Sequence, residues 1–486
     1  MKDHDGGPIK TFGWQLVKAV LAAVVVIVYS RVMGAYGRGS LSILLLNLQM
    51  VLMVSELVAG GALANVLSQY PAKRILPTAW IFLLLVLILG YCVGWFQYVL
   101  PNQGDLPLNF DHPHIIHLNL LFFQGLFLGS LAIQYNVYQV KGWVQQRNKL
   151  QVMLEVFKLL GIAFCLEAIH GYLFPRIRAI DLSAVQAVEV PVGQTLDYIH
   201  GFDETAVLWI LVYASGLACV GSLVYLWKHQ AFSDSNHNRT WHPPTDLFRS
   251  GLMSQIGHIL LFLLYRMPLW WMANEFGNTA AGVLANALLM ADTLWIFGNS
   301  FGTILHSRML RWGVYKKKFA RLLSLYVVIS GLGTLAAIAV LMLLPPDFYV
   351  WIFGDTFGGL KEAFVLISPA VLFLGLSAPM GHYLHAQNRF KALILSYGLS
   401  LLVLILCWKG MDGFVSPRAV ESYGRESMGL MDRKMWVALQ QFRRMMAVNL
   451  SFFVLLLCNY LQVRKDIKWK GILLSIRRLL RRSLAK

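Results

Sequence analysis

Long apolar segments recur along the chain and are separated by short polar connections. None of them shows the strict alternation of apolar and polar positions that a membrane barrel strand requires. A membrane-spanning helix needs about 20 predominantly apolar residues, and each segment is long enough. The pattern therefore predicts an all-α polytopic membrane protein with about twelve transmembrane helices. The expected spans are 12–34, 41–69, 76–100, 114–140, 150–174, 205–228, 250–273, 279–305, 320–344, 363–386, 390–410 and 445–463.

The charges of the connections predict how the chain lies in the membrane. If the N terminus is cytoplasmic, every cytoplasmic connection carries Lys or Arg, such as Lys73 and Arg74 in the first of them. The opposite connection at 101–113 has two aspartates and no basic residue. Cytoplasmic loops of membrane proteins carry an excess of Lys and Arg. We therefore expect a multi-pass protein of the bacterial inner membrane with both termini in the cytoplasm.

Twelve spans divide naturally into two halves of six. We expect an N-terminal lobe over 1–228 with a periplasmic insertion at 175–204. A C-terminal lobe is expected over 229–463 with a periplasmic insertion at 411–444. Residues 464–486 alternate apolar and basic groups with a helical period, which predicts an amphipathic cytoplasmic tail on the anionic leaflet.

Composition narrows the class of protein. The chain is 57% hydrophobic and 14% charged, whereas a soluble domain carries roughly 25% charged residues. The formal net charge of +18 is explained by basic cytoplasmic loops, so no nucleic-acid partner is expected. The cysteines all lie in apolar segments without a CxxC pair, so neither a disulfide framework nor a metal site is indicated. They are Cys92, Cys165, Cys219, Cys407 and Cys458.

A faint internal repeat relates the two halves. Each half has a Tyr followed closely by an Arg, then a glycine-containing outer turn, and then an Asn and an acid on the next helix. The matching residues are Arg31, Asn47 and Glu56 in the first half and Arg266, Asn286 and Asp292 in the second. Two similar halves are typical of many transporters.

Polar residues within the spans are the candidate site. A charge at the bilayer centre costs about 2.5–3.5 kcal/mol, so such residues usually face a bundle interior or a cavity. Because cations predominate, we expect contacts to an anionic group such as a phosphate. The candidate substrate-binding residues are Arg31, Arg266, Lys18, His258, Asn47 and Asn286. Lys18 and Arg31 each have an alternative to substrate binding. Lys18 can extend to the cytoplasmic surface, and Arg31 can lie at the outer membrane interface.

Acidic residues and a histidine pair complete the candidates. Glu56 and Asp292 either sense a coupling ion or form structural partners for the arginines. His382 and His385 lie on one face of a predicted helix, but the sequence offers no third ligand, so no metal is expected. Glu155 and Lys158 are spaced to pair with each other.

Two stretches resemble the polysaccharide flippases of the MOP superfamily, the Wzx/PST group, which is distantly related to MurJ and the MATE exporters. The first is YSRVMGAYGRGSLSILLLNLQMVLMVSELVAGGAL, which is similar to the first hairpin of that family. The second is WIFGDTFGGLKEAFVLISPAVLFLGLSAPMGHYLHAQNRFKALILSYGLSL, which looks like its ninth to eleventh helices. The insertions at 175–204 and 411–444 depart from common members.

The resemblance implies two six-helix lobes around a central cavity that works by alternating access. It implies a substrate, an undecaprenyl-pyrophosphate-linked oligosaccharide, that moves from the inner to the outer leaflet. In related flippases arginines contact the pyrophosphate, and Arg31 and Arg266 match those positions. No enzyme activity and no cofactor are expected. Members of this superfamily commonly use an ion gradient or the membrane potential, so Na⁺ and H⁺ are the candidate coupling ions. Expected partners are the lipid-linked substrate, membrane lipids, a polysaccharide polymerase and glycosyltransferases.

Three other functions stay open. A MATE-like exporter of small organic cations shares the fold but requires an anionic interior, which the arginines argue against. A polytopic glycosyltransferase or polymerase that uses a lipid-linked donor usually needs an acid in the first outer loop, and that loop, GAYGRGS, has none. The next outer loop, which holds Asp105, Asp111, His112 and His114, is the alternative place for such a site. A scaffold for a glycan or secretion assembly is the third alternative.

Overall fold

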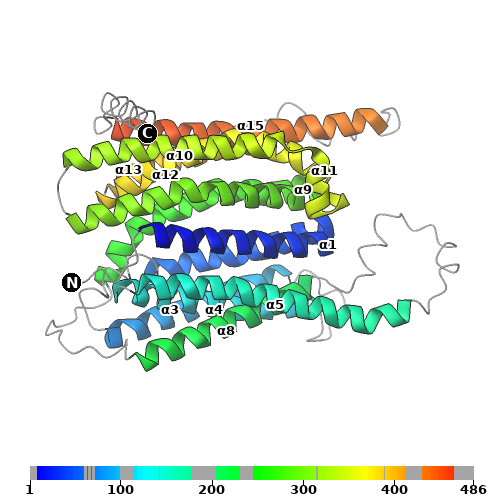
Figure 1. Ribbon diagram of the computed structural model, residues 1–486, viewed down its shortest axis with the longest axis horizontal. Coiled ribbons are helices and arrows are strands. Elements are labelled where there is room, and N and C mark those ends of the chain that lie inside the picture. The colour runs from blue at the N-terminus through cyan, green and yellow to red at the C-terminus, as the bar shows by residue number, and fades with distance from the viewer. Residues whose placement is uncertain are drawn as a thin grey trace, which may run out of the picture. The chain divides into compact units, whose positions relative to one another are not determined.

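The computed structural model describes residues 8–59, 63, 67, 72–98, 113–141, 143–177, 204–229, 245–312, 316–387, 389–410 and 430–464. Every regular element in these ranges is helical, as the sequence predicts. The helices are α1 (Pro8–Ala59), α3 (Ala72–Tyr98), α4 (Pro113–Val140), α5 (Val144–Ile177), α8 (Glu204–Lys228), α9 (Thr245–Trp312), α10 (Lys316–Leu343), α11 (Pro346–Phe353), α12 (Leu360–Ala386), α13 (Phe390–Gly410) and α15 (Leu430–Val463) (Figure 1). A 3₁₀ turn, η2 (Asp355–Phe357), follows α11.

Nine helices in the described ranges are long and apolar enough to cross a membrane. Two of these spans, Gly13–Leu57 and Gln255–His306, have 45 and 52 residues, about twice the length that one crossing needs. Each contains a glycine at which the helix is broken, so each crosses twice. α5 has 34 residues and is long enough for one more crossing. The prediction of an all-α membrane protein with about twelve crossings is therefore confirmed.

Gly34 and Gly277 make the turns within α1 and α9. Their φ angles are 69° and 83°, with ψ at −177° and 174°, a backbone region that is essentially open to glycine alone. The sequence predicts a short loop at each of these places. The structure shows instead that the second helix begins directly after the glycine, because one residue of this conformation reverses the chain (Figure 1).

The chain forms two compact units. Unit 1 comprises Met1–Gln255, Leu269–Ala285 and Tyr349–Gly358. Unit 2 comprises Ile256–Pro268, Asn286–Phe348 and Gly359–Lys486. The turn of α9 thus belongs to unit 1, whereas most of its length belongs to unit 2.

Within unit 1 the hairpins of α1 and α9 cross through two glycines. A Cβ atom added to Gly39 would overlap the carbonyl oxygen of Asn278, and one added to Gly282 would overlap that of Ala35. Small residues permit such close backbone approach between membrane helices. Each glycine lies five residues after its own turn, and the two turns, like the two glycines, are 243 residues apart. This reciprocal contact gives the register of the internal repeat.

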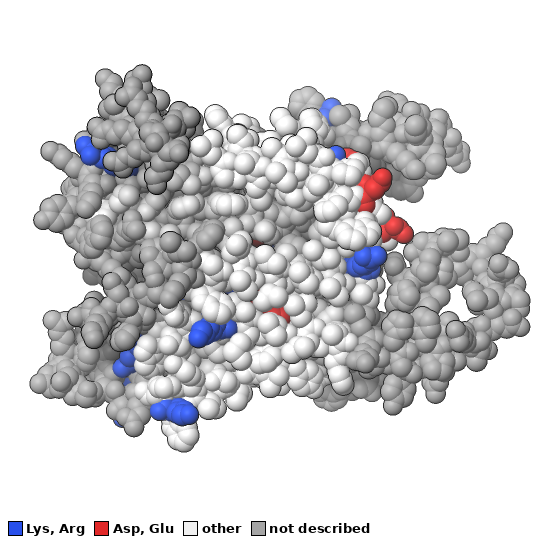
Figure 2. Space-filling model, in the orientation of Figure 1, with Lys and Arg blue, Asp and Glu red and all other residues white. Residues whose placement is uncertain are grey.

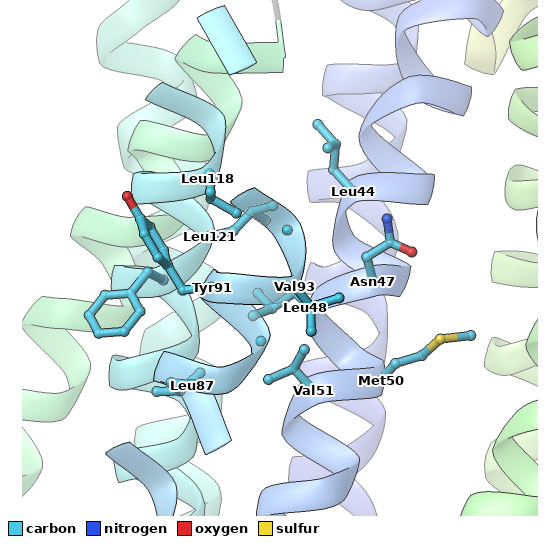
Figure 3. A pocket seen from close by; sticks show the side chains of 13 residues that line it. Leu44, Asn47, Leu48, Met50, Val51, Leu87, Tyr91, Val93, Leu118 and Leu121 are labelled. Atoms are coloured by element: carbon cyan, nitrogen blue, oxygen red, sulfur yellow. The ribbon is translucent and has the colours of Figure 1, made fainter. Parts of the chain in front are cut away.

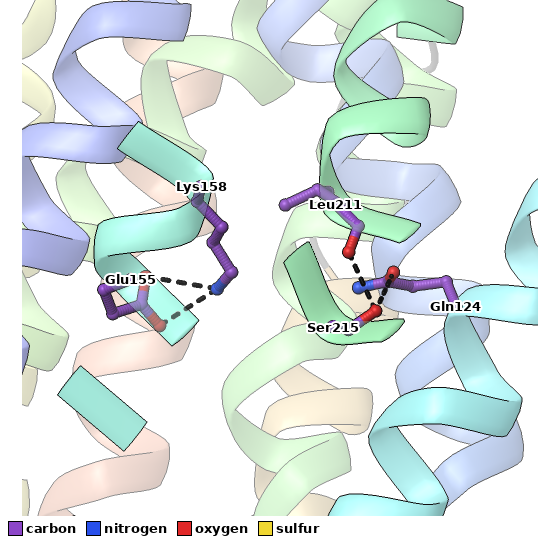
Figure 4. A network of polar contacts seen from close by, with 5 residues as sticks. All are labelled: Gln124, Glu155, Lys158, Leu211 and Ser215. Carbon is purple, nitrogen blue, oxygen red and sulfur yellow. Dashed lines mark hydrogen bonds and ion pairs between the residues drawn. The ribbon is translucent and has the colours of Figure 1, made fainter. Parts of the chain in front are cut away.

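The rest of unit 1 packs α1, α3, α4, α5 and α8 around apolar side chains. Leu41, Leu120 and Leu208 are fully or almost fully buried where α1, α4 and α8 meet. A buried polar link also joins α4 to α8, because the Ser215 hydroxyl lies 2.9 Å from Oε1 of Gln124 (Figure 4). Hydrogen bonds of this kind hold helices together where hydrocarbon surrounds them.

In unit 2, a side chain of α15 forms hydrogen bonds with backbone groups of α12 beside a proline. Pro369 has no amide hydrogen and its ring displaces the preceding turn, which removes helical hydrogen bonds. The Asn449 side chain of α15 donates to the Leu366 carbonyl at 2.8 Å and accepts from the Ala370 amide at 3.0 Å. One amide therefore satisfies both backbone groups, as a membrane interior demands.

The outer surface of the helices is apolar. Phe164, Trp227 and Leu343 expose 74%, 78% and 84% of their surface, which is unfavourable in water and favourable in lipid. In Figure 2 uncharged residues dominate the visible face over the helices. The protein is therefore a polytopic membrane protein.

The structure differs from the predicted elements near the end of the chain and after α10. The last helix, α15, begins at Leu430, so the second half of the predicted insertion 411–444 is a helix that continues into the final crossing. The short helix α11 was not predicted, because its eight residues show no long pattern. Most of the insertion 175–204, the segment 411–429 and the basic tail after residue 464 lie outside the described residues.

Candidate functional site

Arg266 and Asp292, both candidate site residues, form an ion pair in unit 2. Nη2 of Arg266 lies 3.0 Å from Oδ2 of Asp292, and the two side chains are 23% and 32% exposed. The guanidinium also lies over the ring of Tyr265, 4.9 Å from its centroid, and the Tyr265 hydroxyl donates to the Leu288 carbonyl at 3.2 Å. Of the two roles predicted for Asp292, this conformation shows that of a partner for an arginine.

Arg31 lies beside the turn of α1, where it holds α11 in unit 1. Its Nη1 donates to the Trp351 carbonyl at 2.9 Å, near the C-terminal end of α11. A cation at this end of a helix also meets the negative end of the helix dipole. Four residues further along α1, the Ala35 amide donates to the Thr356 hydroxyl at 3.0 Å. In this conformation Arg31 fastens a connecting segment to the hairpin turn.

Arg31 and Arg266 are not equivalent in the structural repeat. The two turn glycines are 243 residues apart, and the same offset makes Asn274 the equivalent of Arg31 and Ala23 the equivalent of Arg266. The sequence match between the two arginines is therefore eight positions out of register and does not make them equivalent. It fails because the Tyr and Arg residues recur at similar, but not identical, distances from the glycine turns.

A group of charged residues lies between α1 and α5 in unit 1, and we call it the α1–α5 charge cluster. It consists of Lys18, Arg147, Glu155 and Lys158. The predicted pair of Glu155 and Lys158 is confirmed, with Nζ lying 2.9 and 3.1 Å from the two carboxylate oxygens (Figure 4). Lys18 has Glu155, Lys158 and Arg147 as its electrostatic neighbours. Cations therefore outnumber the carboxylate by three to one in this cluster.

Buried polar atoms without a hydrogen-bond partner lie on α5 and on the adjacent α4. Asn148 is 2% exposed, and neither its amide nitrogen nor its amide oxygen has a hydrogen bond within the described ranges. The Tyr135 hydroxyl and Nε of Arg147 are in the same condition there, although Nη1 of Arg147 donates to Gln139 at 3.2 Å. Such groups are costly unless a ligand or water satisfies them.

The predicted spans 114–140 and 150–174 leave Arg147 and Asn148 in a cytoplasmic loop. The signal was present in the spacing of residues 148, 155 and 158, which lie on one face of a helix. The apolar segment begins at residue 150 but α5 begins at Val144, so the apolar pattern alone does not show that residue 148 is helical.

Asn47 lines an apolar pocket of about 310 Å³ in unit 1. The pocket is formed by the second half of α1 with α3 and α4, and Figure 3 shows the Asn47 amide beside Leu44 and Val51. Apolar side chains supply almost all of its walls, among them Leu87 and Val93. The pocket suits a hydrocarbon chain better than an anion.

The other predicted residues lie in three different places. Nε2 of Gln255 lies 3.4 Å from Oε2 of Glu56, within unit 1. Asn286 is fully buried in unit 2. The ring of His258 stacks on that of His385, with centroids 5.9 Å apart. Among the described residues no group of three or more His, Cys, Asp or Glu side chains has a geometry that could hold a metal ion.

Comparison with known proteins identifies the fold. No model of a protein family matches the sequence, and no curated protein matches it. Solved structures do match over nearly the whole chain. The lipid II flippase MurJ in an inward closed conformation has a TM-score of 0.56 at 12% identity, with 94% of this chain and 89% of MurJ covered.

Two structures of MATE transporters are similar to the same degree. A MATE in complex with MaL6 has a TM-score of 0.58 at 9% identity, with 95% of this chain and 97% of that chain covered. An outward-facing multidrug resistance MATE family transporter of the MOP superfamily has a TM-score of 0.55 at 12% identity, with the same coverage. The chain therefore has the twelve-helix fold that MurJ and the MATE transporters of the MOP superfamily share.

Proposed function

We propose that the protein is a flippase that moves an undecaprenyl-pyrophosphate-linked oligosaccharide, the repeat unit of a surface polysaccharide, from the inner to the outer leaflet of the cytoplasmic membrane. It does so by alternating access, with both chain termini in the cytoplasm. The protein acts as a transporter and not as an enzyme, and it delivers its substrate to a polysaccharide polymerase.

The observation that carries this proposal is the excess of cations in the α1–α5 charge cluster. Three cations, Lys18, Arg147 and Lys158, accompany one carboxylate, Glu155, on α1 and α5. A pyrophosphate would balance the excess, and the unpartnered amide of Asn148 would be satisfied by polar groups of the same ligand. An organic cation would meet repulsion at this place instead.

Fold similarity alone does not choose between a flippase and a cation exporter. The TM-scores to MurJ and to the MATE transporters differ by only 0.02 at most among the three compared structures. The charge of the interior is the feature that separates the two functions, and it favours an anionic substrate. The apolar pocket beside Asn47 is a place for part of the lipid chain.

The other candidate residues have secondary roles in this proposal. A guanidinium carries five donors, so Arg31 and Arg266 can each contact a phosphate besides their present partners. Glu56 and Asp292 are the carboxylate candidates for a coupling ion, either Na⁺ or H⁺. The hairpin crossing at Gly39 and Gly282 would have to separate in the course of transport.

Binding of undecaprenyl pyrophosphate to the purified full-length protein in nanodiscs tests the assignment. Replacing Lys18 by Ala should weaken binding by about 10- to 100-fold, since a hydrogen bond to a charged group contributes about 1.5–3 kcal/mol. Replacing Glu155 by Gln removes the only carboxylate of the cluster and should tighten binding. Native mass spectrometry or a fluorescence titration gives both dissociation constants.

Lys228→Ala is the matched control, because Lys228 is an exposed lysine at the end of α8 in the same unit. Its dissociation constant should stay within twofold of that of the wild type. Weaker anion binding in Glu155→Gln, together with unchanged binding in Lys18→Ala, would show that the cluster does not hold the pyrophosphate.

A further inference from the structure

Four histidines gather at one end of unit 2, and we call them the histidine cluster. They are His258 and His306 of α9 and His382 and His385 of α12. Ring centroids are 5.1 Å apart for His306 and His385, 5.9 Å for His258 and His385, and 6.4 Å for His306 and His382. His306, His382 and His385 are not among the candidate substrate-binding residues.

The geometry fixes how the rings share hydrogens. Nε2 of His306 and Nδ1 of His385 are 3.2 Å apart, so one ring donates a hydrogen and the other accepts it. Nε2 of His382 lies 2.8 Å from Oδ1 of Asn299. An amide oxygen only accepts, so this nitrogen carries the hydrogen and Nδ1 is the basic nitrogen of His382.

The cluster can hold one added proton, but not several. A proton added to the donor ring of the His306–His385 pair gives an imidazolium that keeps the hydrogen bond as a stronger, charge-assisted one. His385 also lies in the last turn of α12, where the helix dipole favours a cation. A second proton would place two like charges within about 5–6 Å of each other, which disfavours it.

Among the described residues no Asp or Glu is an electrostatic neighbour of the four histidines, although Glu56 lies beside Gln255, three residues before His258. The electrostatic neighbours of His382 are the other three histidines, and those of His385 are His306 and His258. The neighbouring parts of α9, α12, α13 and α15 also contain no Asp or Glu. These are residues 256–268, 293–312, 370–410 and 445–464. Titratable or charged residues on the neighbouring elements towards this end include Arg321 and Tyr326 of α10, Tyr383 of α12, Arg389 before α13, Lys391 and Tyr397 of α13, and Tyr460 and Arg464 at the end of α15.

The positions of the rings depend on close packing between α9 and α12. Gly302 has no side chain, and a Cβ at this position would overlap the ring of His382. No Asp or Glu among its described electrostatic neighbours would compensate an imidazolium in this group, so its charge is best stabilised by water that enters as the His382 ring moves away from Gly302. His258 and Asn299, which border the cluster, are exposed rather than enclosed by protein.

We propose that the histidine cluster binds the coupling proton of the transporter. One proton from water joins an imidazole, loosens the contact between the ends of α9 and α12, and leaves when the rings return to the packed arrangement. This inference rests on the proposed transport function for its purpose, but proton binding itself can be measured without any substrate. It assigns the coupling ion as H⁺ and places it apart from Glu56 and Asp292.

Potentiometric titration of the purified full-length protein between pH 7.5 and 5.5 tests the proposal. The comparison is with a variant that carries His258→Gln, His306→Gln, His382→Gln and His385→Gln. The wild type should take up about one proton more than the variant. Four independent histidines of ordinary pKa would take up about three more, and an inert packed cluster would take up none. Either of these results overturns the proposal.

Hydrogen–deuterium exchange of the wild type gives a second measurement that needs no variant. After correction for intrinsic rates, peptides covering 299–306 and 380–387 should exchange faster at pH 5.5 than at pH 7.5. His117→Gln, in unit 1, removes a histidine that contacts Thr205 at 2.9 Å and should leave this response intact. Equal exchange at both pH values, or stoichiometric Zn²⁺ binding that abolishes proton uptake, would overturn the proposal.

Discussion

Replacing Gly39 by Ala is expected to disfavour the described conformation by about 1–3 kcal/mol, the usual cost of forcing extra volume into a packed contact. The added methyl group would overlap the backbone of α9 at Asn278, and backbone cannot rotate away as a side chain can. We expect the hairpins of α1 and α9 to separate, so that peptides covering 29–45 and 272–288 exchange hydrogen 5- to 100-fold faster, in line with about 1.4 kcal/mol for each factor of ten.

Gly282→Ala should reproduce this effect, because its added methyl group meets the Ala35 carbonyl in the same way. The double variant should cost less than the sum of the two single variants, since both disrupt one contact. Gly221→Ala is the control, because nothing lies within 4 Å of a Cβ at this position in α8. Unchanged exchange in both Gly39→Ala and Gly282→Ala would show that the crossing is not close-packed in the membrane.

Replacing Asp292 by Ala is expected to lower the free energy of unfolding by about 1.5–3 kcal/mol. The substitution leaves Arg266 within the membrane helices without its ion-pair partner, although the ring of Tyr265 still lies beneath the guanidinium. The partial exposure of both side chains keeps the expected cost at this level rather than at that of a fully buried pair. Thermal unfolding in detergent, followed by the loss of monodisperse protein, measures the effect.

The double variant Arg266→Met with Asp292→Leu supplies the control for this pair. It replaces both charges by apolar groups, so it should be more stable than Asp292→Ala alone. The double-mutant cycle should show a coupling energy of about 0.5–3 kcal/mol. Additive effects of the two single substitutions would mean that the ion pair contributes nothing to the stability of unit 2.

The crossings could be predicted from sequence because lipid imposes a simple rule. Apolar segments long enough to span must be helices, and this rule gave the number of crossings within the described chain. The turns were harder to predict from the sequence than the crossings. Loops were expected after residues 34 and 273, yet single glycines with positive φ reverse the chain, and a sequence pattern does not show the φ angle of a glycine.

The candidate site could be predicted only in part from the sequence, for a different reason. The pairing of Glu155 with Lys158 follows from helical spacing, whereas the pairing of Arg266 with Asp292 joins two halves of a hairpin and depends on its register. That register is set by Gly277, eleven residues beyond Arg266, the predicted match to Arg31. The histidine cluster brings together residues up to 127 positions apart, and only packing between α9 and α12 reveals it.

Flipping by the purified wild-type protein in liposomes tests the proposed function most directly. A fluorescent undecaprenyl-pyrophosphate-linked oligosaccharide is placed in one leaflet, and its arrival in the other is followed with an impermeant quencher. The proposal predicts that the protein speeds this arrival well above the rate in protein-free liposomes, and that Lys18→Ala slows it while Lys228→Ala does not. Arrival at the protein-free rate, together with protein-dependent movement of a small organic cation, would contradict the proposal and favour an exporter.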